Sequence, residues 1–270
     1  MSQPQYRKET RLLQITDCHL FAEVNNSLLG INTFDSFNAV LAQIKQNDTQ
    51  FDYAVFTGDL SQDQSAESYQ HVAKEIKNWQ QPSFWLPGNH DDIPNMQQAF
   101  SPFNIDWPEH AILGDMWQMV TINSQVLDCP HGYINHEQLQ RLSSILNQYN
   151  NLFTIVFLHH HPLLSGSHWL DQHCLHNRDE FWQVLSAFPQ VKAVVCGHIH
   201  QDLDMEHQGV RVLATPSTCI QFLPNSKDFV LDEKAPGWRE ITLLEDGSIE
   251  TVVGRIAAHL FSADMSSTGY

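Results

Sequence analysis

The chain has 270 residues, 42% hydrophobic and 17% charged, which is the composition of an ordinary globular protein with a large core. Its formal net charge of −17 argues against a nucleic-acid groove, because such a groove needs a basic stripe. Apolar runs fall short of the roughly 18–20 residues of a membrane span, and the polar residues 1–11 do not resemble a signal peptide, so we expect a cytoplasmic protein with no membrane partner.

Cysteine and histidine usage narrows the chemistry of a possible site. The five cysteines are scattered and form no C-x-x-C pair, which argues against a disulfide framework or a thiolate zinc site. The 16 histidines suggest a bound metal. Such a metal could supply the positive charge that this acidic chain would need to bind an anionic substrate.

The first third of the chain predicts alternating strands and helices. We expect strands over residues 11–16, 52–57 and 83–86, with amphipathic helices over 34–44 and about 69–79. Polar residues follow each strand directly: Asp17-Cys18-His19, then Gly58-Asp59, then Gly88-Asn89-His90-Asp91. With a side-chain period of two, Asp17 and His19 are expected to point to the same side.

The rest of the chain continues this alternation and then becomes rich in strands. We expect strands over 117–123, 153–158, 191–196 and 210–214, helices around 139–146 and 178–188, and a hairpin of 239–244 with 249–253. Two strands end on His159-His160-His161-Pro162 and Gly197-His198-Ile199-His200. We predict one α/β layered domain over residues 1–270, with a β-rich part at about 203–256 and a frayed tail.

Five predicted strands thus end on potential metal ligands. In layered α/β folds, sites form beyond the carboxyl ends of the strands. Seven ligands exceed what one first-row metal takes from protein, so they favour two metals that share a carboxylate. Oxygen and imidazole ligands without thiolate suit Mn, Fe, Co, Ni or Zn. The candidates are Asp17, His19, Asp59, Asn89, His159, His198 and His200.

The ordered motifs D-x-H, G-D, G-N-H-D, H-H-x-P and G-H-x-H span residues 17–200 and resemble the calcineurin-like metallophosphoesterase superfamily. Finer details resemble the bacterial class III 3′,5′-cyclic-AMP phosphodiesterases, and they extend over nearly the whole chain: residues 29–33, 58–65, 167–173 and 214–219, with the triple histidine. This resemblance implies a four-layer αββα sandwich, in which two mostly mixed β-sheets are flanked by helices. It also implies hydrolysis of cyclic AMP to 5′-AMP, which would lower cellular cyclic AMP.

The resemblance also implies a division of labour among the candidate residues. One metal would take Asp17, His19, Asp59 and His200, and the other Asp59, Asn89, His159 and His198, with Asp59 bridging. Iron or manganese would be preferred. His90 would bind no metal but would face the phosphate and assist the leaving oxygen. The substrate would lie against His19, Asp59, Asn89, His90, His159 and His200.

Several residues keep alternative interpretations. We take His159 as the ligand because it directly follows its strand, and His160 could instead bond a phosphate oxygen or a backbone group. Asp91 could orient a ligand, although we favour a helix cap before Ile93-Pro94. Many superfamily members carry an Asp three residues after the bridging one, where this chain has Gln62, so the role of Asp63 stays open. Trp169 could border a base pocket or simply pack its loop.

The function also has alternatives. Another phosphoesterase on the same scaffold, such as a general phosphodiesterase or a nucleotide pyrophosphatase, would share the motifs. A scaffold without catalysis would tend to lose ligands, whereas all seven and His90 are present here. The seven arginines avoid the motifs, which favours a singly charged diester over a monoester. The sequence gives no indication of the oligomeric state.

Overall fold

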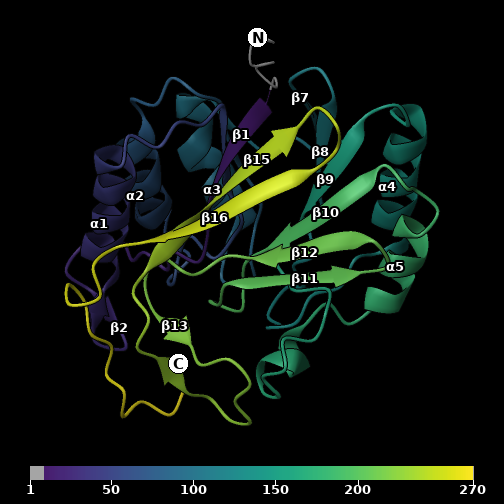
Figure 1. Cartoon of the computed structure of the whole chain (residues 1–270). Coiled ribbons are helices and arrows are strands. Elements are labelled where there is room, and N and C mark those ends of the chain that lie inside the picture. The colour runs from purple at the N-terminus through teal and green to yellow at the C-terminus, as the bar shows by residue number, and fades with distance from the viewer. Residues whose placement is uncertain (1–8, 270) are drawn as a thin grey trace, which may run out of the picture.

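The computed structural model describes residues 9–269, which form two six-stranded β-sheets packed against each other with helices outside (Figure 1). The first sheet is parallel from β1 to β6; β15 is antiparallel to its neighbours β1 and β16. Its strands in spatial order are β16 (Ile249–Arg255), β15 (Gly237–Leu244), β1 (Glu9–Ile15), β4 (Tyr53–Phe56), β5 (Ser83–Trp85) and β6 (Ile105–Asp106).

The second sheet is also mixed. Four central strands run parallel, and the edge strands β11 and β7 are antiparallel to their neighbours. In spatial order the strands are β11 (Leu203–His207), β12 (Val210–Ala214), β10 (Val191–Cys196), β9 (Phe153–Phe157), β8 (Trp117–Thr121) and β7 (His110–Leu113). Short ribbons pair β2 (Ser27–Leu28) with β3 (Ile31–Asn32) and β13 (Gln221–Phe222) with β14 (Leu231–Asp232).

Three separate apolar clusters define the four layers. The cluster between the sheets joins Leu12 and Val55 of the first sheet to Trp117 and Phe157 of the second. Full burial of each such side chain contributes about 1.5–3 kcal/mol. A second cluster packs the first sheet under α1 (Thr33–Gln46), α2 (Ala66–Ile76) and α3 (Ile93–Phe100), and a third packs the second sheet under α4 (His136–Gln148) and α5 (Arg178–Leu185). The predicted αββα sandwich is therefore confirmed.

Local sequence explains where the helices begin. The side chains of Asn32, Ser65 and Asp92 accept a hydrogen bond from the third backbone N–H of α1, α2 and α3. Asn135 and Gln138 form a complete capping box at α4. The cap of α3 is Asp92, so our expectation that Asp91 caps this helix is wrong, and Asp91 is left for another role. Among the described residues, no helix is both long and apolar enough to cross a membrane.

The end of the chain differs from the frayed tail that we expected. Phe261 packs against both of the apolar clusters that lie between a sheet and its helices. The N–H of Asp264 donates to the carbonyl of Leu29 at 2.7 Å. Gly269 lines a pocket of about 480 Å³. Short 3₁₀ turns complete the inventory, η1 (Ser101–Phe103) after α3 and η2 (Leu170–His173) in the loop before α5.

Candidate metal centre

The loops that follow β1, β4, β5, β9 and β10 meet at one edge of the sandwich. Backbone hydrogen bonds hold them together within the first sheet: Asp17 N–H donates to Gly58 O at 3.0 Å, and His19 N–H to Asp59 O at 2.9 Å. The N–H of His198, from the second sheet, donates to both carboxylate oxygens of Asp17 at 3.1 Å. The site is therefore assembled from both sheets, as the carboxyl ends of parallel strands predict.

The backbone at the site is in a conformation that side chains with a Cβ rarely adopt. Five of the seven predicted ligands have positive φ: Asp17 (53°), His19 (48°), Asp59 (52°), His198 (68°) and His200 (49°). Such conformations cost about 1–3 kcal/mol each and persist where the surroundings impose them. Asp17 and His19 lie beyond the end of β1 at Ile15, so the period-two argument does not apply to them, although both reach the same cluster.

Two glycines allow the loops to approach this closely. A Cβ on Gly88 would overlap the carboxylate of Asp59. A Cβ on Gly58, whose φ is +93°, would lie 2.5 Å from Gly88 N and 2.6 Å from His159 Nδ1. Glycine therefore stands where the loops after β4 and β5 touch.

The predicted ligand atoms cluster in overlapping groups. In two groups, Asp17 with His19 and His200, and Asp17 with Asp59 and His159, the ligand atoms lie within 4.8 Å of one another. The Nε2 atoms of His19 and His200 are 3.2 Å apart, and His159 Nε2 lies 3.1 Å from Asp59 Oδ2. Asp17 belongs to both groups, and His198 joins His159 in a further group with His160. Apart from Asn89, these groups contain the ligands that we predicted for both metals.

Hydrogen bonds on the far side of three rings fix which nitrogen faces the centre. His159 Nδ1 donates to Thr57 O at 2.8 Å and His200 Nδ1 to Ile220 O at 3.0 Å, because carbonyl oxygens can only accept. His19 Nδ1 lies 2.7 Å from Gln62 Oε1. Each arrangement turns Nε2 toward the centre, which is how protein partners orient metal-binding histidines. Gln62 was known from the sequence only as a departure from the motif, and the structure gives it this orienting position.

Unsatisfied buried atoms test whether the site suits metal ions. Asn89 Oδ1 and His198 Nε2 are buried and have no hydrogen-bond partner in the described chain, and buried His159 Nε2 faces only the carboxylates of Asp59, at 3.1 Å, and Asp17, at 4.0 Å. Leaving such an atom unpaired costs about 1–3 kcal/mol, so native proteins rarely do so without a ligand. All three are ligands predicted for the second metal. Their donor types and burial therefore fit a divalent cation.

The charged and titratable groups of the site shift one another's pKa values. Burial lowers the pKa of His159, but Asp59 and then Asp17 outweigh it and raise this pKa to about 9. Burial and the neighbouring His200 lower the pKa of His19 to about 3. Burial opposes the charge of Asp59, yet His159 and His90 hold its pKa well below the usual range. A cation at this position would take the place of the His159 proton, since metals bind neutral imidazole.

A family model now adds an independent observation: the model of the calcineurin-like phosphoesterases matches residues 10–202, more than half of the chain. The chain belongs to the calcineurin-like phosphoesterase family. Members of this family use a binuclear metal centre, so the chain is a metal-dependent hydrolase. The solved structure of a dimetal phosphatase from Danio rerio shares the fold, with a TM-score of 0.62 at 14% identity over 92% of this chain and 99% of that one.

Two curated relatives are much more similar in sequence. The chain is 49% identical to the "3′,5′-cyclic adenosine monophosphate phosphodiesterase CpdA" of Vibrio vulnificus over 96% of this chain and 95% of that protein. It is 47% identical to the Escherichia coli protein of the same name over 96% of this chain and 94% of the relative. The similarity thus extends well past the family model, to the part of the chain that follows residue 202.

Asp91 holds together two of the loops that carry predicted metal ligands. Its buried carboxylate accepts from the N–H groups of Leu60 (3.0 Å), Ser61 (3.2 Å) and Gly88 (2.9 Å), so it joins the loop after β4 to the loop after β5. Burial and then the nearby Asp59 raise the pKa of Asp91 to about 7. Gln125 adds a connection from the second sheet, since its Nε2 donates to Gly88 O and Asp91 O. Asp91 therefore holds the backbone beside Asp59 and Asn89, and sequence analysis did not find Gln125.

Asp63, His160 and His161, whose roles the sequence left open, occupy different positions in the structure. Asp63 accepts from the N–H of Ala22 and from Ser65, so it stabilises its own loop outside the ligand clusters. His161 Nε2 lies 3.4 Å from Asp171, and its ring stacks near the ring of His198 at 5.6 Å. The middle residue of the histidine run, His160, lies in a cluster with His159 and His198.

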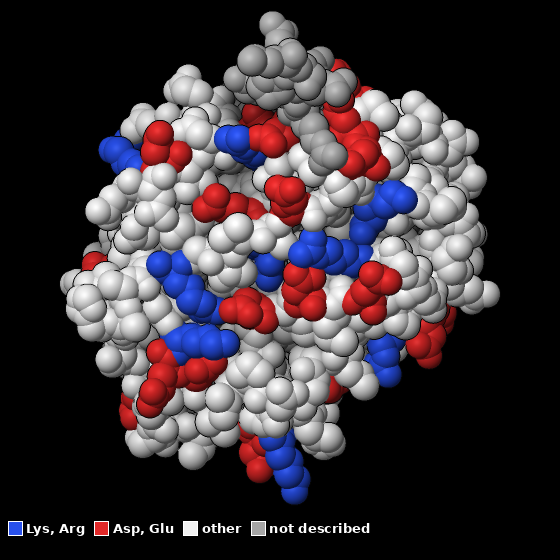
Figure 2. Space-filling model, in the orientation of Figure 1, with Lys and Arg blue, Asp and Glu red and all other residues white. Residues whose placement is uncertain are grey.

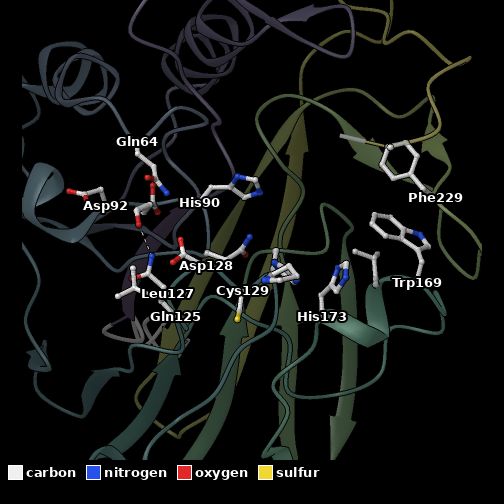
Figure 3. Close-up of a pocket in the computed structure, with 16 residues that line it drawn as sticks. Gln64, His90, Asp92, Gln125, Leu127, Asp128, Cys129, Trp169, His173 and Phe229 are labelled. Atoms are coloured by element: carbon white, nitrogen blue, oxygen red, sulfur yellow. Dashed lines mark hydrogen bonds between the residues drawn. The ribbon is translucent and has the colours of Figure 1, made fainter.

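A pocket of about 480 Å³ opens beside the centre (Figure 3). Asn89, His90 and His198 line one part, and Trp169 and Phe229 line another. Figure 3 shows the His90 ring on the opposite side of the cavity from these two aromatic side chains. Trp169 borders this pocket, and it also packs its loop, because its Nε1 donates to Ser226 Oγ at 3.2 Å.

Proposed function

We propose that this phosphoesterase hydrolyses 3′,5′-cyclic AMP to 5′-AMP and so lowers cellular cyclic AMP. The observation that carries the proposal is the similarity to relatives that bear this activity in their names, at 47–49% identity over 96% of the chain. A shared metal centre alone would not select this substrate, because the family contains other phosphoesterases. The shape and charge of the pocket give separate support.

The pocket suits a nucleotide. Its volume of about 480 Å³ lies within the range of small-molecule sites. With the phosphate beside His90 and Asn89, a purine can extend across the cavity to Trp169 and Phe229. The Trp169 ring is held edge-to-face against Phe229 at 5.1 Å and Phe222 at 4.9 Å. A fixed aromatic ring of this kind is a good platform for a base.

The charge of the pocket favours a diester. Among the described residues that line it, none is Lys or Arg, whereas Asp91, Asp92 and Asp128 are acidic. Arginines instead pair with carboxylates elsewhere, as in Arg211 with Asp204 and Arg255 with Asp202. Basic and acidic side chains lie interspersed on the face in Figure 2. Bound cations would therefore be the main positive charge, which suits a substrate with a single negative charge.

We assign the metal ligands as the sequence predicted. One cation would be held by Asp17, His19, Asp59 and His200, and the other by Asp59, Asn89, His159 and His198, with iron or manganese preferred over cobalt, nickel or zinc. When bound, such cations neutralise phosphate charge and lower the pKa of a coordinated water. His90 points into the pocket, where its imidazole can hold a proton for the leaving 3′ oxygen. The whole chain would act as one cytoplasmic domain.

A substrate comparison tests the proposal. After reconstitution with Mn²⁺ or Fe²⁺, we expect 3′,5′-cyclic AMP to be hydrolysed with a higher kcat/KM than cyclic GMP, 2′,3′-cyclic AMP or a nucleoside pyrophosphate, as followed by chromatography. Bis(4-nitrophenyl) phosphate should be cleaved faster than 4-nitrophenyl phosphate, for the charge reason above. A preference for a pyrophosphate or for the monoester would overturn the named function and leave the metal centre intact.

Replacement of Trp169 tests the base platform. Base–aromatic contacts contribute about 1–3 kcal/mol, so Trp169→Ala should raise the KM for cyclic AMP roughly tenfold and change kcat less. Trp169→Phe should recover part of the loss. Methyl 4-nitrophenyl phosphate, which has no base, serves as the control substrate and should be hydrolysed almost as well by the variant. Equal losses on both substrates would mean that Trp169 only packs its loop.

A further inference from the structure

His160 is the one member of the histidine run His159-His160-His161 that enters the centre without an assigned role. Its side chain is fully buried, and one of its nitrogens lies within 4.8 Å of the ligand atoms of His159 and His198. The ring centroids are 5.0 Å from that of His159 and 4.7 Å from that of His198. Its Nε2 is buried and has no hydrogen-bond partner among the described residues. A nitrogen left in this way points to a ligand of some kind.

The hydrogen-bond partner of the other ring nitrogen, Nδ1, indicates what kind of ligand Nε2 would bind. His160 Nδ1 lies 2.8 Å from Ser124 Oγ. The same hydroxyl oxygen accepts from the backbone N–H of His160 at 3.3 Å, so both side-chain hydrogen bonds of Ser124 are made with His160. The oxygen accepts one bond from the backbone, and the hydroxyl proton can be donated to Nδ1. A neutral His160 that accepts at Nδ1 carries its own proton on Nε2.

The ligand histidines show the opposite arrangement. Nδ1 of His159 and Nδ1 of His200 face carbonyl oxygens, which forces the proton onto Nδ1 and leaves a lone pair on Nε2 for a cation. In His160 the hydroxyl of Ser124, which can donate, replaces the carbonyl and permits the reverse tautomer. An N–H group cannot ligate a metal, but it donates well to an anionic oxygen.

We propose that His160 donates a hydrogen bond from Nε2–H to a non-bridging phosphate oxygen of the substrate, and that Ser124 is the positioning residue that selects this tautomer. The proposal rests on the phosphodiester substrate proposed above. It assigns a contact to a residue that neither binds metal nor protonates the leaving group.

The surroundings hold the ring of His160 in place. A Cβ on Gly132 would lie 2.5 Å from His160 Cγ, so the backbone of the loop before α4 packs directly on the ring. The ring therefore has little room to turn and is held ready for a ligand.

Phosphate binding tests the contact without relying on turnover. In the Zn²⁺-loaded protein, His160→Asn should keep the metal content of the parent by elemental analysis, while the Kd for inorganic phosphate rises about tenfold in calorimetry, because hydrogen bonds to charged groups contribute about 1.5–3 kcal/mol. The matched control is His110→Asn, on β7 outside the pocket, which should change neither quantity. Loss of one metal in His160→Asn would make His160 a ligand, and an unchanged Kd would remove the contact. Either result overturns the proposal.

The tautomer can be measured in the unmodified protein. In a histidine-¹⁵N-labelled, Zn²⁺-loaded sample, the ring signals that disappear in His160→Asn should show the proton on Nε2, and a proton on Nδ1 would overturn the proposal. Ser124→Ala should weaken phosphate binding about threefold, because His160 would then be a mixture of both tautomers. Ser124→Thr, which keeps a hydroxyl, should restore the binding. No effect of Ser124→Ala would refute the positioning role. These measurements use phosphate alone, so they stay decisive even if cyclic AMP proves not to be the substrate.

Discussion

Asp59→Asn should reduce turnover by at least about a thousandfold and remove metal from both positions. The reason is the central place of this carboxylate: Oδ2 lies 3.1 Å from His159 Nε2, and Oδ1 accepts from the N–H of His90 at 2.8 Å. Asp59 also belongs to two of the ligand clusters, one with His19 and one with Asp17. An amide keeps the shape but loses the charge, and a charge shared between two cations stabilises both. Elemental analysis and cyclic AMP turnover measure the two effects.

Asp63→Asn is the matched control, because it changes the same residue type on the same loop. Its carboxylate accepts from Ala22 N–H and Ser65 and lies outside the clusters, so metal content should be unchanged and turnover should fall less than about threefold. The bridging assignment would be wrong if Asp59→Asn kept two metals per chain and most of its turnover. A large loss of metal or turnover in Asp63→Asn would instead indicate that any change in this loop disturbs the site, whether or not it removes the bridging charge.

The sequence predicted the place of the site well because of a simple rule of chain topology. Asp17, Asp59 and Asn89 each follow a parallel strand, and parallel strands carry their next residues to the same edge. The apolar runs of these strands are continuous because helices and the other sheet cover them, so they are easy to recognise. By contrast, β11 has a mostly exposed pattern and gave no such signal.

The supporting residues were harder to predict, because their partners are distant in sequence. Gln62 meets His19 across 43 residues, and Gln125 meets the loop of Gly88 and Asp91 across 37 and 34 residues. Asp91 and Asp92 are adjacent, and either can cap a helix that starts at Ile93. Only the folded chain shows that Asp91 accepts from Leu60 and Gly88 and leaves the cap to Asp92. The left-handed backbone of the ligands has the same origin, since tertiary contacts impose it.

His90→Ala should keep both metals and lower kcat for cyclic AMP by about 10²–10⁴, the usual contribution of a positioned proton donor. His90 lines the pocket, and its ring lies edge-on to that of His19 at 5.1 Å, so it is next to the centre but outside the ligand set that we assign. Asn89→Ala is the contrasting variant one residue away, and it should lose metal because the buried Oδ1 is removed.

The leaving group separates proton donation from a general loss of structure. The 3′ oxygen of ribose is a strongly basic alkoxide when it departs, whereas 4-nitrophenoxide is stable without a proton. The defect of His90→Ala should therefore shrink to about tenfold or less on bis(4-nitrophenyl) phosphate, because this substrate hardly needs the acid. Equal losses on both substrates, with two metals retained, would assign His90 to phosphate binding instead. Near-normal turnover of cyclic AMP would remove it from the mechanism, and the proton would then have to come from solvent or from another group that lines the pocket.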